Sequence, residues 1–210
     1  MMRAPIIVER DSHGPRLRRC IDLLVLALAA PIAIPLIAVL ALAVKLDSGG
    51  AAFWGHERVG RDGRRFRLLK LRTMTTDADQ LKLDLDHLNV LAWPDFKIRN
   101  DPRVTRLGRW LRRTSLDELP QLWNLLRGQL TLVGPRACSV PVDRYELWQT
   151  ERLDVTPGLF GLWQADGRGR VDFRERCRMD IDQLHSPGPI RETRLAVKTI
   201  VAAASFRDNF

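Results

Sequence analysis

The sequence has few cysteines, and none is placed to form a familiar cysteine motif. The three that are present, Cys20, Cys138 and Cys177, lie far apart in a chain of 210 residues. No C-x-x-C pair occurs, which excludes a zinc ribbon and a thioredoxin-type redox motif. An odd, sparse cysteine count also argues against a disulfide framework and suits a reducing compartment.

Several common catalytic and nucleotide-binding motifs are missing as well. The four histidines form no H-x-x-x-H or H-E-x-x-H pattern, so zinc-dependent hydrolysis is not predicted. The sequence contains neither a G-x-x-x-x-G-K-[ST] loop nor a G-x-G-x-x-G fingerprint. It therefore supports neither a P-loop enzyme nor a dinucleotide-binding domain of the Rossmann type.

Positive charge, in contrast, is in excess. Lys and Arg total 34 against 25 Asp and Glu, which gives a formal net charge of +9. With 45% hydrophobic residues the chain has the composition of a folded domain. The excess charge calls for an acidic partner, and composition leaves three kinds open: nucleic acid, anionic lipid, or a phosphate-bearing substrate.

One long apolar run begins close to the N-terminus of the sequence. Residues 23–44 carry no charge, and a helix of that length rises about 33 Å, close to one hydrocarbon thickness. A cleaved signal peptide fits poorly, because the run is long and Lys45-Leu46-Asp47 is no small-residue cleavage site. A straight membrane-spanning helix and a re-entrant helix that returns to its own side are the two remaining interpretations.

The flanks and the prolines of this run favour the re-entrant interpretation. Basic residues mark the cytoplasmic side of a membrane, and they lie on both flanks, at Arg18 and Arg19 before the run and at Lys45 after it. Pro31 and Pro35 each remove a backbone donor and favour a bend. We therefore expect a basic segment 1–22, a re-entrant helix-break-helix over 23–44, and a catalytic domain over 45–210 continuous with it.

The rest of the sequence predicts a mixed α/β fold that is mainly helical with a small sheet. Residues 51–74 have the pattern of a hairpin that turns at Gly60-Arg61-Asp62-Gly63, and residues 77–90 that of a helix. Apolar residues at helical spacing follow over 104–111 and 119–126, with a short strand expected at 131–133. The region 191–204 is amphipathic, as expected of a helix lying at a membrane interface.

An acidic pair precedes the second of these helices. Ser115 and Glu118 have the spacing of a capping box, and Pro120 suits a first helical turn. Asp117 and Glu118 are therefore expected at a helix N-terminus, where they are held ionised with the help of Arg112. An ionised aspartate can ligate a metal or attack phosphorus. The alternative is that both carboxylates only cap the helix.

The string RRTSLDELPQLWNLLRGQLTLVGPR, residues 112–136, resembles the signature of the bacterial sugar transferase family. These proteins are the monotopic polyprenyl-phosphate phosphoglycosyl transferases. Residues 57–60, 66–74 and 157–164 agree with the family in type and order, so the resemblance extends over about residues 16–168. The chain resembles the small type that consists of the catalytic domain alone.

This resemblance implies a reaction and a location. The family transfers a phosphosugar from a UDP-sugar to polyprenyl (undecaprenyl) phosphate with Mg²⁺, releasing UMP and starting exopolysaccharide, O-antigen or glycoconjugate synthesis. Its members lie monotopically on the cytoplasmic face of the bacterial inner membrane, anchored by a re-entrant helix broken near a proline. The partners implied are the two substrates and membrane lipids, without nucleic acid; a homodimer is one of the assemblies left open.

The resemblance also implies roles for individual residues. Asp117 matches the nucleophile, which forms a covalent phosphosugar intermediate, and Glu118 matches its partner in Mg²⁺ binding or proton handling. The positions that match residues for substrate phosphate or the nucleotide are Arg112, Arg136, Lys70, Arg72 and Arg168. Two hypotheses from other classes remain: a membrane-tethered nucleic-acid-binding module, and a family member that acts as a non-catalytic adaptor.

Overall fold

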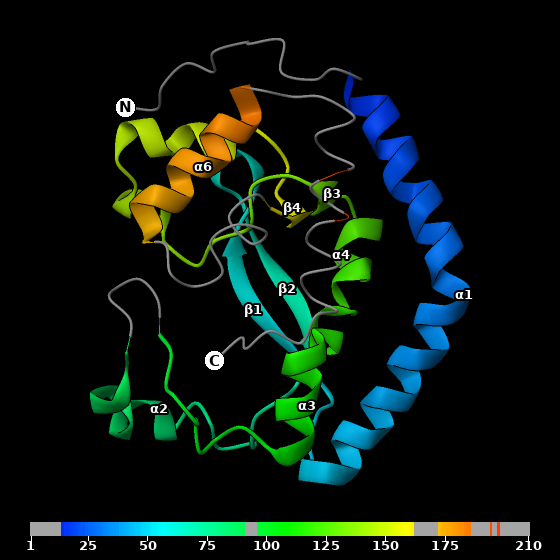
Figure 1. Cartoon of the computed structure of the whole chain (residues 1–210), viewed down its shortest axis with the longest axis vertical. Helices are drawn as coiled ribbons and strands as arrows, with labels where there is room; N and C mark the ends of the chain where they lie inside the picture. Colours follow the sequence, from blue (N-terminus) through cyan, green and yellow to red (C-terminus); the bar gives the residue numbers. More distant parts are fainter. Residues whose placement is uncertain (1–13, 91–95, 162–171, 186–193, 195–196, 198–210) are drawn as a thin grey trace.

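The structure is a computed structural model that describes residues 14–90, 96–161 and 172–185, together with Arg194 and Val197. It is mainly helical, with two small sheets and one long apolar helix near the N-terminus (Figure 1). The predicted fold class is confirmed at this level. The amphipathic segment 191–204 lies, apart from residues 194 and 197, outside the described residues.

Helix α1 (Gly14–Ser48) is one continuous helix of 35 residues that passes through both prolines. The predicted interruption at Pro31 and Pro35 is therefore wrong for the helix itself. Figure 1 shows instead a bowed helix whose hollow side faces the rest of the molecule. Because the prolines are four residues apart, their missing backbone bonds lie on one side of the helix and favour a bend. Both rings are exposed, on the side away from the domain.

The inner side of α1 packs against the domain near both of its ends. Leu40 and Val44 form a buried cluster with Leu71 and Leu111. Nearer the N-terminus, Leu26 packs against a second cluster of Leu68, Leu125, Leu130 and Ala137. The outer side is apolar and exposed, and among the described residues α1 is the one helix long and apolar enough to cross a membrane.

Polar contacts fasten the N-terminal part of α1 to helix α4 (Gln121–Leu126) and strand β3 (Thr131–Val133). Arg19 donates to the carbonyl oxygens of Leu125 and Leu126, both at 2.6 Å, and so satisfies acceptors at the end of α4. The carboxylate of Asp22 accepts hydrogen bonds from the Thr131 hydroxyl at 2.7 Å and the Leu132 amide at 2.9 Å. The helix is thus part of the domain's own packing.

The predicted hairpin is present. Strand β1 (Phe53–Val59) pairs antiparallel with β2 (Arg65–Leu71), and the turn between them is a 3-10 helix at Arg61–Gly63. Asp62 and Gly63 both have positive φ, at 56° and 74°, a conformation that Asp and Gly tolerate. A second, parallel pair joins β3 to β4 (Gly158–Phe160), which confirms the strand expected at 131–133.

The remaining elements surround the hairpin. Helix α2 (Leu81–Asp84) and a 3-10 turn (Asp86–Leu88) replace the longer helix predicted for 77–90. Helix α3 (Arg106–Thr114) is followed by the 3-10 helix η3 (Leu116–Glu118) and then by α4. Two further 3-10 helices, η4 (Val142–Arg144) and η5 (Leu147–Leu153), precede helix α6 (Phe173–His185), which lies on the far side of the hairpin from α1 (Figure 1).

Candidate active site

Asp117 and Glu118 lie in η3, the short turn that joins α3 to α4. Ser115 ends α3 in a left-handed conformation, with φ 57°, and its side chain makes no capping bond to η3. The predicted capping box is therefore wrong. The amide of Glu118 instead binds the carbonyl oxygen of Ser115 at 3.1 Å, and α4 begins only after Pro120. Ser115 is the C-terminal cap of α3, and its side chain does not cap the helix that follows.

Asn124 of α4 fixes η3 beside strand β2. Its Oδ1 accepts from the Leu69 amide at 2.9 Å, and its Nδ2 donates to the Arg67 carbonyl at 2.8 Å and to Gln129 at 2.8 Å. These bonds satisfy backbone groups at the free edge of β2, next to Lys70. Sequence reasoning missed Asn124. The available signal was an amide in the middle of an apolar helix, where burial demands hydrogen-bond partners.

Four of the predicted site residues meet at this point. The Lys70 ammonium is 2.7 Å from Oε1 of Glu118 and 3.5 Å from Oδ2 of Asp117. Arg136, in the loop after β3, places a guanidinium nitrogen 2.6 Å from the same oxygen of Glu118. The result is a compact cluster of two carboxylates and two cations, which we call the acidic-pair cluster: Lys70, Asp117, Glu118 and Arg136.

The surroundings of the two carboxyl groups push their pKa values in opposite directions. Burial raises the pKa of Asp117, which is 7% exposed; the charge of Glu118 adds to this, while Lys70 and Arg112 act against it. Burial also acts to raise the pKa of Glu118, but Arg136 and Lys70 outweigh it and leave that pKa well below its ordinary value. Glu118 is thus held as an anion by its two cations, and Asp117 is the more basic carboxylate of the pair.

Arg112 of α3 is positioned where this helix closely approaches the chain that follows β2. Its Nε donates to the Thr73 hydroxyl at 2.8 Å, and its charge acts on Asp117. Gly108 allows this approach, because a Cβ there would lie 2.0 Å from the Thr73 carbonyl oxygen. Burial lowers the pKa of Arg112, yet a guanidinium remains charged at neutral pH.

Arg72, another predicted site residue, is not a member of this cluster. Arg72 donates to the Ser48 hydroxyl at 3.0 Å and to the Gly49 carbonyl, so it fastens the C-terminal end of α1. These contacts place the Arg72 guanidinium at the end of α1, and its role in phosphate binding stays a prediction. Arg168 lies outside the described residues.

The described residues contain no group of three or more His, Cys, Asp or Glu side chains that could hold a metal ion. The two carboxylates of Asp117 and Glu118 are the acidic donors of the candidate site. Mg²⁺ is commonly bound by one or two carboxylates together with substrate phosphates, so this pair fits a site that a phosphate-bearing ligand completes. In the cluster, Oε1 of Glu118 faces Lys70 and Arg136, and Oδ2 of Asp117 faces Lys70.

Comparisons with known proteins identify the family of the chain. The profile described as "Bacterial sugar transferase" matches residues 14–205. The chain is 36% identical to an exopolysaccharide production protein of Rhizobium meliloti, over 94% of this chain and 89% of that protein. It is 37% identical to a UDP-glucose:undecaprenyl-phosphate glucose-1-phosphate transferase of Caulobacter vibrioides, over 87% and 68%.

Some relatives are considerably longer. The chain is 41% identical to a UDP-galactose-lipid carrier transferase of Erwinia amylovora, over 80% of this chain but only 36% of that protein. It thus spans about a third of the length of such relatives. The match of the family profile across nearly all of the sequence, and the relative covered almost end to end, decide the assignment: this chain belongs to the bacterial sugar transferase family.

Proposed function

We propose that the chain is a polyprenyl-phosphate phosphoglycosyl transferase, which moves a phosphosugar from a UDP-sugar to undecaprenyl phosphate and releases UMP. The observation that carries this proposal is the acidic-pair cluster, in which a buried aspartate lies beside a glutamate already neutralised by Lys70 and Arg136. The name of the Caulobacter relative describes such a transfer. That of the Rhizobium relative describes exopolysaccharide production, which supports a role in starting polysaccharide synthesis.

The cluster suits a transfer in two steps. In the first step a carboxylate oxygen of Asp117 attacks the sugar-side phosphorus, an aspartyl–phosphorus bond forms, and the bond from that phosphorus to the bridging oxygen breaks, so that UMP leaves with the electron pair. In the second step an oxygen of undecaprenyl phosphate attacks the same phosphorus and releases Asp117. Splitting the transfer in this way allows two bulky anions to react in turn at one site.

The cations and the carboxylates of the cluster have different roles in these steps. Lys70 and Arg136 neutralise the phosphate oxygens of donor and acceptor, and between substrates they are held in place by Glu118. Asp117 and Glu118 would hold Mg²⁺ when a diphosphate is bound. The ion would supply further neutralisation of charge at phosphorus.

The lipid substrate gives the apolar side of α1 a function. We infer that the chain is a monotopic protein of the cytoplasmic face of the inner membrane and that α1 enters and leaves the bilayer on one side. Both ends of α1 are fastened to the same domain, through Arg19 and Arg72, which supports this topology. The middle of the helix exposes large apolar side chains: Leu28, Ile32, Ile34 and Val39.

Labelling tests this topology. Cys20 is exposed near the N-terminal end of α1, and an Asp47→Cys variant supplies a thiol at the other end. In membrane vesicles a membrane-impermeant maleimide should reach both thiols only from the cytoplasmic side, with Cys20→Ser as the control for background labelling. Labelling of one end from the opposite side would establish a true span and contradict the re-entrant topology.

UMP release tests the reaction. The full chain in nanodiscs with Mg²⁺ and undecaprenyl phosphate is offered a panel of UDP-sugars. Multiple-turnover UMP release should require both the lipid acceptor and one sugar of the panel. If the folded protein turns over none of the donors and instead only binds them, the adaptor hypothesis takes the place of the enzyme.

A further inference from the structure

Strand β1 presents a row of side chains that the transfer chemistry does not use. Trp54, His56 and Arg58 alternate along β1 and so share one face of the hairpin. In the register of the pair, Trp54 lies opposite Lys70 and His56 opposite Leu68. Residues directly opposite each other in an antiparallel pair point to the same face, so this row lies on the face that carries Lys70.

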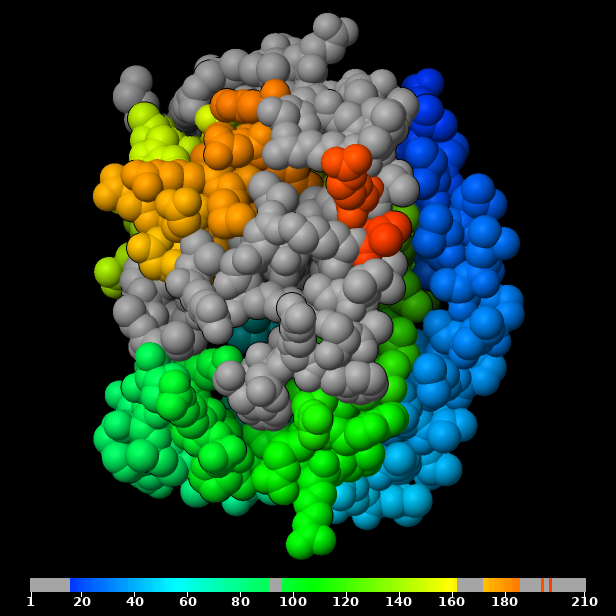
Figure 2. Space-filling model, in the orientation of Figure 1, coloured from blue at the N-terminus to red at the C-terminus, as the bar shows by residue number. Residues whose placement is uncertain are grey.

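The two halves of this face differ in how they are covered. On β2, Leu68 is 3% exposed and packs against Leu125, Leu130 and Ala137. On β1, Trp54 is 41% exposed, and His56 and Arg58 are only half-buried. Figure 2 shows a hollow on this side of the molecule, with atoms in the teal of the hairpin at its floor and green residues along its lower border.

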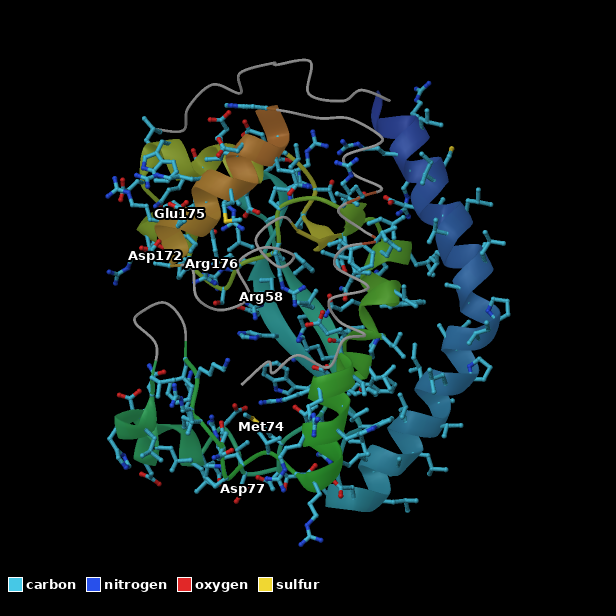
Figure 3. The ribbon with its side chains drawn as sticks, viewed as in Figure 1. Arg58, Met74, Asp77, Asp172, Glu175 and Arg176 are labelled. Atoms are coloured by element: carbon cyan, nitrogen blue, oxygen red, sulfur yellow. The ribbon has the colours of Figure 1, made fainter. Side chains whose placement is uncertain are left out.

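Figure 3 places Arg58 at the middle of the molecule, with Met74 and Asp77 below it and Asp172, Glu175 and Arg176 of the α6 region above it. The backbone after Arg136 reaches the far end of β1, where the Val59 amide donates to the Cys138 carbonyl at 2.8 Å. The row on β1 therefore begins beside Lys70 and ends near the segment that carries Arg136. At about 3.4 Å per residue, Trp54 to Arg58 covers about 14 Å, which is room for a nucleotide laid along the strand.

His56 is fixed as a hydrogen-bond donor. A guanidinium nitrogen of Arg58 lies 3.2 Å from its Nδ1. Because a guanidinium only donates, Nδ1 accepts, and the single proton of the neutral ring is then on Nε2. Burial, together with the charges of Arg58, Lys70 and Lys82 and against that of Asp79, lowers the pKa of His56 to about 4, so the ring is neutral at pH 7. The ring also contacts the Trp54 indole, with centroids 4.9 Å apart.

The position of the row, on the strand farther from the membrane helix, indicates which substrate it suits. In Figure 1, β2 and α4 lie between β1 and α1, so β1 is the strand farther from the lipid side. The polyprenyl chain approaches from the side of α1. On the proposed function the water-soluble half of the donor lies away from the lipid, which is the side of β1.

We propose that the face of β1 formed by Trp54, His56 and Arg58 holds the nucleoside half of the donor. This inference rests on the proposed function. His56 donates its Nε2–H to a carbonyl oxygen of the pyrimidine base, and the exposed indole of Trp54 offers an aromatic face on which the base stacks. Arg58 keeps His56 in the donating tautomer. Lys70 and Arg136 bind the phosphates of the donor, next to this row of side chains.

Binding measurements separate this nucleoside contact from phosphate binding. The probes are UDP and inorganic diphosphate, titrated calorimetrically into the full chain in nanodiscs with Mg²⁺. His56→Phe keeps an aromatic ring but has no donor, and it should weaken UDP about tenfold while leaving the affinity for diphosphate unchanged. His56→Gln, which can donate, should recover most of the loss. Trp54→Ala should also weaken the binding of UDP but not that of diphosphate. This variant is the test if His56→Phe does not fold.

A matched control is available on the same strand. Glu57 lies between His56 and Arg58 in sequence but on the opposite face, in an exposed pair with Arg65, so Glu57→Gln should bind both probes as the wild type does. Equal weakening of UDP and diphosphate in His56→Phe, or no weakening in either variant, would overturn the nucleoside site. Absence of UDP binding by the wild type would instead contradict the proposed function.

Discussion

The Asp117→Asn variant should lose sugar-phosphate transfer on the order of a thousandfold or more while folding normally. A carboxamide has the shape of the carboxylate but lacks the anionic oxygen that attacks phosphorus, and loss of a nucleophile has effects of this size. The remaining ion pairs, from Glu118 to Lys70 and Arg136, do not involve Asp117 and should hold the site together. The measurement is the rate of lipid-dependent UMP release, alongside thermal unfolding of both proteins.

The matched control is Asp62→Asn. Asp62 is exposed in the turn of the hairpin, with positive φ, which asparagine also tolerates. This variant should transfer sugar phosphate at the wild-type rate. If Asp117→Asn retains a rate within tenfold of the control, Asp117 is not the nucleophile, and the two-step scheme would have to be abandoned.

The second large effect is expected at a buried ion pair that contacts the backbone of Arg136. Arg152 of η5 and Asp180 of α6 are 4% and 0% exposed, and their charged atoms are 2.5 Å apart. The same guanidinium nitrogen donates to the carbonyl oxygen of Arg136 at 2.7 Å. Because the Arg136 side chain binds Glu118, a continuous line of contacts joins α6 to the acidic-pair cluster.

Replacing Arg152 by methionine should lower the free energy of unfolding by about 3–5 kcal/mol at pH 8, because it leaves a buried carboxylate without its cation. Burial already raises the pKa of Asp180 to about 6 against the lowering by Arg152 and Arg176. Without Arg152 the pKa rises further above the unfolded value of about 3.9. The folded state of the variant then binds a proton that the unfolded state does not. The loss in the free energy of unfolding should therefore become smaller as the pH falls from 8 to 5.

A double variant separates stability from positioning. In Arg152→Met/Asp180→Leu no charge is left unpaired, so most of the lost stability should return. The Arg136 carbonyl still lacks its donor, and we expect a raised KM for the donor at a stability close to that of the wild type. Chemical denaturation in detergent and steady-state kinetics measure the two quantities. Recovery of both in the double variant would show that the pair does not position Arg136.

The convergence of Lys70, Asp117, Glu118 and Arg136 was predictable because all four lie in strings that carry the family resemblance. The hairpin turn and the strand at 131–133 were predictable from local turn and alternation signals. Ser115 was misread because spacing alone does not show which of two adjoining helices a residue serves. Its positive φ depends on how α3 and α4 pack.

Other features depend on contacts between distant parts of the chain. Arg72 lies two residues after Lys70, but it follows the end of β2 and reaches the end of α1, a contact that no local pattern contains. Pro31 and Pro35 predict a disturbance of the helix, yet whether the helix bends or breaks depends on the domain surface along which it packs. The same is true of Asn124, whose partners on β2 are more than fifty residues away in sequence.

Incubation of the wild-type chain with its UDP-sugar in the absence of undecaprenyl phosphate tests the central claim most directly. If Asp117 takes the phosphosugar, UMP should be released in a burst of one equivalent per protein, and mass spectrometry of the rapidly quenched protein should find the phosphosugar on the peptide that contains Asp117. A protein that releases UMP only when the lipid acceptor is present, with no adduct on that peptide, would transfer the group directly, and the role assigned to Asp117 would be contradicted.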